Sequence, residues 1–159
     1  MKPFTLAFIF NDKNQVLLCA KKKTNSGFIA SLGKWNGPGG AVEAGETIKQ
    51  GMIREIGEET KIEISEALLE SAGYLQFRFV NKSDWDKDVH IFVVKDYVGG
   101  FEETEEMKPE RFNISDIPYE RMRDSDKNWL PELLSGKYVS YRMDCDDDGV
   151  VLGCEPIIS

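Results

Sequence analysis

Residues 40–62 read GAVEAGETIKQGMIREIGEETKI, and this stretch decides the predictions of fold and function. Its second part, from Thr47 to Thr60, is predicted to form a helix. Thr47 followed three residues later by Gln50 is a capping-box pattern, which is typical of a helix N-terminus. The apolar residues form one stripe that should pack on a sheet, and they are Met52, Ile53 and Ile56.

The polar face of this helix carries three carboxylates. Because helical residues advance ~100° each, Glu55, Glu58 and Glu59 fall within an arc of roughly 100°. Crowded carboxylates repel each other, and a divalent cation would turn that repulsion into a binding site that suits Mg²⁺ or Mn²⁺. Gly51 lies in the same arc, where it should leave room for a metal or a phosphate. A merely solvated acidic face is the alternative that the helix alone leaves open.

The rest of the chain predicts an α/β protein with a mixed sheet. Strands are expected at 4–10, 15–20, 73–80, 88–97, 138–144 and 150–157. Other expected segments are loops at 21–32 and 81–87, a short extended or irregular piece at 66–69, and a short strand or turn at 111–113. A second helix is expected at 128–134, with Pro131 in its first turn. No repeat or composition shift divides the chain, which favours one domain over residues 1–159.

Composition and charge exclude several classes of protein. The 159 residues contain no apolar run of ~18 residues, so no membrane span is expected. The net charge of −8 argues against a broad basic surface for a nucleic acid polymer, although a metal ion can bridge a negative protein to phosphates. Three cysteines without a CxxC spacing fit a reducing cytoplasm rather than a disulfide framework or a zinc site. We expect a cytoplasmic protein that acts on a small molecule, and we expect it to be a monomer.

Eight positions of residues 40–62 resemble the signature of the Nudix hydrolase superfamily, G-x5-E-x7-R-E-U-x-E-E-x-G-U, in which U is aliphatic. They are Gly40, Glu46, Arg54, Glu55, Ile56, Glu58, Glu59 and Ile62. This resemblance outweighs the solvated-face alternative and implies a Nudix α/β/α sandwich with a mixed β-sheet. Lys61 stands where the signature has its final glycine, and a left-handed lysine there should cost ~1 kcal/mol.

The resemblance extends to the MutT-type branch that hydrolyses oxidised purine nucleoside triphosphates. The supporting segments are 21–23, 34–40, 88–92, 105–109, 117–119 and 126–131. It implies a Mg²⁺-dependent enzyme, with Mn²⁺ as a substitute, that cleaves nucleotides such as 8-oxo-dGTP to the monophosphate and pyrophosphate and so sanitises the nucleotide pool. The alternatives are a Nudix hydrolase of a nucleotide sugar, a dinucleotide or a capped RNA end, and a noncatalytic module that binds a nucleotide.

The same resemblance implies metal-binding and catalytic roles. The residues that match metal ligands are Glu55, Glu58, Glu59, Gly39 through its backbone carbonyl, and Glu106 from a loop. Either Glu58 or Glu59 could instead act as a base, and the sequence leaves this choice open. Arg54 is expected to orient a glutamate by a charge-assisted bond rather than to contact phosphate, and Glu46 to support that network.

Substrate-binding positions also follow from the resemblance, and they are Lys21, Asn36, Phe77, Arg123, Ser125 and Asp126. Asn36 and Asp126 match base-reading positions, with a turn residue and a helix cap as their alternative roles. Lys21 matches a basic residue near the substrate. Phe77 lies in the strand that lines the base pocket, with core packing as its alternative role.

Two of these positions depart from the animal-type pocket. Arg123 replaces a tryptophan that stacks on the base, and Ser125 replaces the first of two adjacent aspartates. An arginine can still stack through its guanidinium plane. A preference for 8-oxoguanine therefore does not follow from the motif alone.

Overall fold

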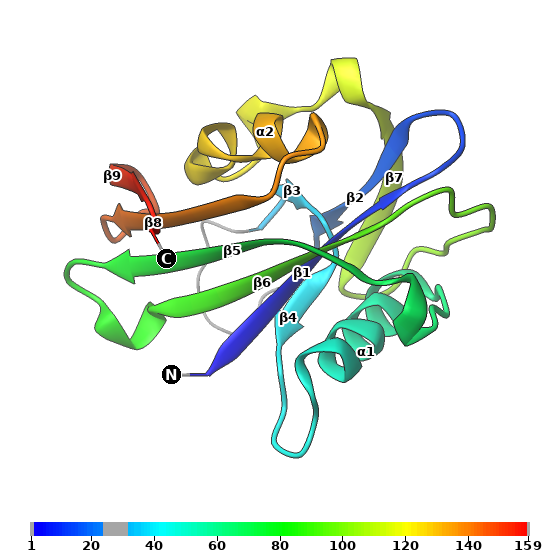
Figure 1. The fold of residues 1–159 in the computed structure, drawn as a ribbon, viewed down its shortest axis with the longest axis horizontal. Coiled ribbons are helices and arrows are strands. Elements are labelled where there is room, and N and C mark those ends of the chain that lie inside the picture. The colour runs from blue at the N-terminus through cyan, green and yellow to red at the C-terminus, as the bar shows by residue number, and fades with distance from the viewer. Residues whose placement is uncertain (1, 24–31, 159) are drawn as a thin grey trace.

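The computed structural model describes residues 2–23 and 32–158, and it contains one mixed sheet with short helices around it (Figure 1). The strands are β1 (Pro3–Phe10), β2 (Gln15–Lys21), β3 (Trp35–Asn36), β4 (Gly39–Ala41), β5 (Glu70–Phe79), β6 (Lys87–Val94), β7 (Met107–Asn113), β8 (Val139–Cys145) and β9 (Val151–Pro156). Their order is β3-β2-β1-β6-β5-β8-β9, with β4 paired to β1 and β7 paired to β2. The pairs β1–β6 and β5–β8 are parallel and the other pairs are antiparallel.

The two faces of the sheet are both covered, which confirms the predicted α/β/α sandwich. Alternate residues of β1 point to opposite faces: Phe8 packs in the core with α2 (Leu130–Leu134), and Ile9 packs in the core with α1 (Ile48–Thr60). Figure 1 shows the two helices on opposite sides of the sheet. Because β1 is buried on both faces, its sequence is a continuous apolar run rather than an alternating one.

The α1 helix begins and ends as its sequence predicts. The Thr47 hydroxyl accepts a hydrogen bond from the Gln50 backbone N–H, and the Gln50 side chain accepts one from the Thr47 N–H, which confirms the capping box. Lys61 ends the helix with φ 65° and ψ 15°, the left-handed conformation expected of the missing glycine. Its N–H still donates to the Gly57 carbonyl at 3.0 Å, so the turn forms despite the steric cost of the side chain.

Several predicted boundaries were wrong. β5 begins at Glu70 rather than at residue 73, β6 begins at Lys87 and ends at Val94, and β7 is a full strand rather than the short piece at 111–113. The helix expected at 128–134 is shorter, because α2 begins at Leu130 and Asn128 ends the preceding 3-10 turn Asp124–Asn128. Pro131 lies at the start of α2 as predicted, and the piece at 66–69 contains the 3-10 turn Glu66–Leu68.

The remaining 3-10 turns are Ser83–Trp85, Ile114–Asp116 and Tyr119–Arg121. Much of the loop predicted at 21–32 lies outside the described residues. In the described parts of the chain, no helix is long and apolar enough to cross a membrane.

The pairing of β1 creates the space for a site. Near its C-terminal end β1 pairs with β2 at Ile9 and Phe10, but near its N-terminal end it pairs with β4 at Phe4 to Leu6. β2 and β4 therefore diverge along one side of β1. The gap between them holds the hollows described next.

Candidate active site

An acidic hollow of about 550 Å³ lies between α1 and the edge of the sheet. We use the name acidic hollow for the space lined by Glu55, Glu58 and Glu59 of α1, Gly39 to Ala41 of β4, Lys21 and Glu106. The structure thus brings together all five predicted metal ligands, although they come from three separate stretches of the chain. Lys21 interacts with Glu55, Glu59 and Glu106 of the hollow, whereas Lys22 pairs with Glu103, and Lys23, which also lines the hollow, pairs with Glu105.

Arg54 organises the acids from one side of the hollow. Its guanidinium donates to both oxygens of Glu46, at 2.8 and 3.0 Å, and to the Ala41 carbonyl at 2.9 Å. It also donates to Glu55 at 2.9 Å and to Glu58 at 3.3 Å. These contacts are those predicted for Arg54 and Glu46. The planar fork of arginine makes such multiple bonding possible, so Arg54 fixes the carboxylates relative to β4.

Glu59 is the most deeply placed of the three helix acids. Glu59 is only 4% exposed, and its Oε1 accepts a hydrogen bond from the Gly39 N–H at 2.7 Å. Burial, together with the nearby Glu55 and Glu106 carboxylates, raises the pKa of Glu59 to about 8 despite that bond. Burial likewise raises the pKa of Glu55. A buried carboxylate is costly unless a positive charge compensates it, and a cation in the hollow would do so.

The glycines beside the acids allow close approach. A Cβ on Gly39 would lie 2.0 Å from the Thr5 carbonyl oxygen, and a Cβ on Gly40 would lie 2.6 Å from the Glu55 carboxylate carbon. The prediction for Gly51 was wrong. It is buried, and a Cβ there would lie 3.1 Å from Val42 and 3.3 Å from the Glu46 Oε1, so Gly51 makes room for the preceding loop rather than for a ligand.

The donor set of the acidic hollow fits a hard divalent cation. Every group that could bind the ion offers carboxylate or carbonyl oxygen, the chemistry that Mg²⁺ and Mn²⁺ prefer. Over residues 2–23 and 32–158, no three His, Cys, Asp or Glu side chains converge into a ready-made metal cluster. Glu55 and Glu58 are turned to Arg54, and Glu59 is bonded to Gly39. The residues that would bind the ion are thus present, and Arg54 and the Gly39 N–H fix the positions of the three helix carboxylates.

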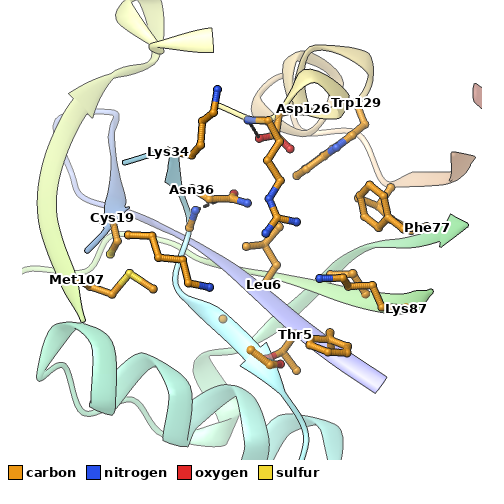
Figure 2. A pocket seen from close by; sticks show the side chains of 18 residues that line it. Thr5, Leu6, Cys19, Lys34, Asn36, Phe77, Lys87, Met107, Asp126 and Trp129 are labelled. Atoms are coloured by element: carbon orange, nitrogen blue, oxygen red, sulfur yellow. Dashed lines mark hydrogen bonds between the residues drawn. The ribbon is translucent and has the colours of Figure 1, made fainter. Parts of the chain in front are cut away.

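A second space, the ring cavity, opens beside the acidic hollow and has a volume of about 140 Å³ (Figure 2). That volume resembles the ~150 Å³ of a cavity known to accept benzene, so it suits one aromatic ring system rather than a whole nucleotide. The predicted substrate residues that line it are Lys21, Asn36, Phe77, Arg123 and Asp126. The two spaces share seven lining residues, so a single ligand can extend from one into the other; the shared residues are Phe4, Lys21, Gly39, Gly40, Lys87, Met107 and Arg123.

Asn36 and Asp126 combine their alternative roles with a place in the ring cavity. The Asn36 Oδ1 accepts from the Gly37 N–H at 2.8 Å, as a turn residue does. The Asp126 Oδ2 accepts from the Arg123 N–H at 3.2 Å, which is the bond made by the third residue of a capping box rather than by the N-cap itself. Asp126 is 2% exposed, and burial raises its pKa to about 7 although Arg123 opposes the shift.

Two further predicted substrate residues, Phe77 and Ser125, differ in their surroundings. Phe77 lies 8% exposed in the core and also lines the ring cavity, so both of its roles are compatible with the structure. Ser125 is buried and does not line the ring cavity. It lines an adjoining hollow of about 200 Å³ with residues 148–150 of the β8–β9 turn.

Sequence reasoning missed Lys87 and Trp129, which also line the ring cavity. Lys87 was expected in a loop, but it is the first residue of β6 and the Cα partner of Phe77. The alternation of Lys87, Val89 and Ile91 could have placed it on the face of the sheet that contains Phe77.

This fold, in which an acidic helix packs against a glycine-containing strand of a mixed sheet, belongs to a known class. Residues 2–133 match the family described as the NUDIX domain, so the chain belongs to the Nudix family. Within it, the chain is 41% identical to an oxidized purine nucleoside triphosphate hydrolase of Danio rerio over 77% of this chain and 74% of that protein. It is 36% identical to the protein of the same name from Mus musculus over 94% of this chain and 90% of that protein.

Solved structures agree with this fold. A MutT protein of Bacillus halodurans superimposes with a TM-score of 0.76 and covers 98% of this chain and 97% of its own. The two sequences are 22% identical, so this likeness supports the shared fold alone.

Proposed function

We propose that this chain hydrolyses oxidised or noncanonical purine nucleoside triphosphates, such as 8-oxo-dGTP, to the monophosphate and pyrophosphate. The observation that carries the proposal is the junction of an acidic hollow with a ring-sized cavity, since a nucleotide presents phosphates at one end and a flat ring at the other. The names of the relatives from Danio rerio and Mus musculus support the same substrate class. Removal of such nucleotides would sanitise the nucleotide pool.

Mg²⁺ is the proposed cofactor, with Mn²⁺ able to replace it, and Glu55, Glu58, Glu59, Glu106 and the Gly39 carbonyl are its proposed ligands. When bound, the ion would neutralise phosphate charge and activate water for attack on phosphorus. Arg54 keeps Glu55 and Glu58 oriented, and the Gly39 N–H keeps Glu59 in place. Lys21 at the junction supplies a positive charge beside the phosphates.

Glu58 and Glu59 both remain candidates for the base. Glu58 is exposed and makes one bond at 3.3 Å to Arg54, so its carboxylate can turn toward a water molecule. Glu59 is buried and its pKa is raised to about 8, so it would serve as a base once a cation in the hollow favours its ionised form. Replacement of either by glutamine retains the shape of the side chain and removes its charge.

The decisive experiment is a substrate panel in Mg²⁺ and in Mn²⁺ with 8-oxo-dGTP, 2-hydroxy-dATP, the ordinary dNTPs and nucleotide sugars. We expect an oxidised purine triphosphate to have the highest kcat/KM and to yield pyrophosphate. Glu58→Gln and Glu59→Gln should abolish turnover, whereas Glu63→Gln, an exposed glutamate beyond the helix, should leave it intact. Wild-type rates in both helix variants would refute the site, and a preference for a nucleotide sugar would refute the substrate class.

The cellular setting is also proposed rather than established. The three cysteines, Cys19, Cys145 and Cys154, are all free, which supports a reducing compartment such as the cytoplasm. We propose a monomer that acts on a small nucleotide, with no nucleic acid polymer or membrane as a partner.

A further inference from the structure

Four cationic side chains line the ring cavity, and they are Lys21, Lys34, Lys87 and Arg123. Lys21 ends β2, Lys87 begins β6, and Arg123 precedes the 3-10 turn Asp124–Asn128. Figure 2 shows the Lys87 ammonium directed into the cavity, beside Phe77 of the neighbouring strand. Its Nζ lies 4.8 Å from the centroid of the Phe4 ring. The cavity therefore presents positive charge from more than one side.

Carboxylates compensate these cations unevenly. Lys21 faces Glu59 and Glu106 of the acidic hollow, and Arg123 interacts with Asp126, the one carboxylate among the described residues that line the ring cavity. Lys87 makes no ion pair with a described carboxylate within 4 Å. Burial, and then repulsion by Arg123 and Lys21, lower the pKa of Lys87 to about 7. A bound anion would relieve this cost.

Aromatic and aliphatic side chains form much of the wall of the ring cavity, together with the polar side chains of Thr5, Cys19 and Asn36. Phe4, Phe77 and Trp129 contribute rings, and Leu75 and Val89 lie on the same face of the sheet as Phe77 and Lys87. A phosphate group would leave these apolar surfaces without a partner. A flat ring that carries negative charge would satisfy both the apolar walls and the cations.

We propose that the ring cavity selects purines whose ring lactam loses a proton near neutral pH, so that the base binds as an anion beside Lys87 and Arg123. Xanthine is the clearest member of this class. Hypoxanthine, a much weaker lactam acid that stays mostly neutral at pH 7, and adenine, which has no lactam, bind less well. This inference rests on the proposed function in assigning the base to the ring cavity, and it specifies which bases are preferred.

The test compares two substrates that differ by one oxo group, xanthosine triphosphate and inosine triphosphate. In the wild-type protein we expect kcat/KM at pH 7 to be at least tenfold higher for the xanthine nucleotide. Lys87→Met retains the aliphatic stem and should lower this ratio about tenfold, the effect of ~1.4 kcal/mol. Lys87→Arg should retain most of the ratio. Lys13→Met, in the exposed turn after β1, is the matched control and should leave the ratio unchanged.

A binding measurement separates failure of this inference from failure of the proposed function. Calorimetric titration with xanthosine monophosphate and inosine monophosphate, without metal, reports the ring preference even if no triphosphate is hydrolysed. Tighter binding of the xanthine nucleotide that is lost in Lys87→Met supports the inference. Equal binding of the two monophosphates, or a preference that Lys87→Met leaves unchanged, overturns it whether or not turnover is observed.

Discussion

Substitution of Gly40 by alanine should impair the acidic hollow while the fold persists. The added Cβ would lie 2.6 Å from the Cδ and Oε1 of Glu55, and ordinary contact begins at 3.4 Å. The Glu55 carboxylate must therefore retreat by about 0.8 Å, away from its 2.9 Å bond with Arg54. Because a displacement of ~1 Å in a reacting group can cost ~10²-fold in rate, we expect kcat/KM to fall by about two orders of magnitude.

The cost of Gly40→Ala in stability should be much smaller. The loss of one hydrogen bond between charged groups is worth ~1.5–3 kcal/mol, and the gain from a less flexible unfolded chain is ~0.4–1 kcal/mol. The net loss of about 1–2 kcal/mol should lower Tm by roughly 2–8 °C. Turnover at 25 °C, measured by pyrophosphate release across a Mg²⁺ titration, would then report the site rather than unfolding, with half-saturation shifted to higher Mg²⁺.

Two other glycines provide controls for this experiment. Gly57→Ala lies in the same helix, and its nearest neighbour would be the Ile62 carbonyl oxygen at 3.7 Å, so it should retain activity and gain up to ~1 kcal/mol. Gly39→Ala would place Cβ 2.0 Å from the Thr5 carbonyl oxygen in the paired strand and should prevent normal folding. If folded Gly40→Ala retained wild-type kcat/KM and Mg²⁺ dependence, the assignment of Glu55 to the metal site would be refuted.

Three further predictions concern single residues. Lys61→Gly should stabilise the protein by about 0.5–1 kcal/mol in urea unfolding, because the left-handed conformation no longer costs ~1–2 kcal/mol, whereas Lys61→Ala should give no gain. Arg54→Lys, which cannot form the paired bonds to Glu46, should lose ~1–3 kcal/mol and about tenfold in kcat/KM. The pKa of Asp126 is raised to about 7 in the folded protein, so the folded state holds a proton that the unfolded state has lost between pH ~4 and pH 7. The free energy of unfolding of the wild-type protein should therefore decrease as the pH rises from ~4 to ~7. This decrease amounts to up to about 4 kcal/mol, and Asp126→Asn should make it smaller. If the variant had the same dependence of unfolding free energy on pH as the wild type, this account would be contradicted.

The acidic helix could be predicted because its determinants are local. The capping box, the apolar stripe and the spacing of the carboxylates all lie within residues 47–60, and the structure confirms the helix that they predict. The position of Lys61 was equally predictable, since a helix that ends at Thr60 needs a left-handed residue next, whichever side chain is present.

The ring cavity was less predictable because it depends on pairing between distant strands. Lys87 was assigned to a polar loop since its neighbours in the sequence are polar, and only its register opposite Phe77 turns it toward the cavity. Ser125 was placed by a matched position, which does not specify the direction of its side chain. It follows Arg123 by two residues, yet the 3-10 turn directs it to the adjoining hollow near the β8–β9 turn.

The two spaces recognise negative charge by opposite means. In the acidic hollow, carboxylates such as Glu59 can accept phosphates only through a cation, which makes hydrolysis depend on metal. In the ring cavity, Lys87 and Arg123 can attract an anionic ring directly. A cationic ring would be repelled there, and a neutral ring would give the partly buried Lys87, which also lines the acidic hollow, no compensating charge from the base. Because Lys21 lies at the junction, a substrate that is negative at both its phosphates and its base satisfies the whole site, so the choice of base rests on charge as well as on shape.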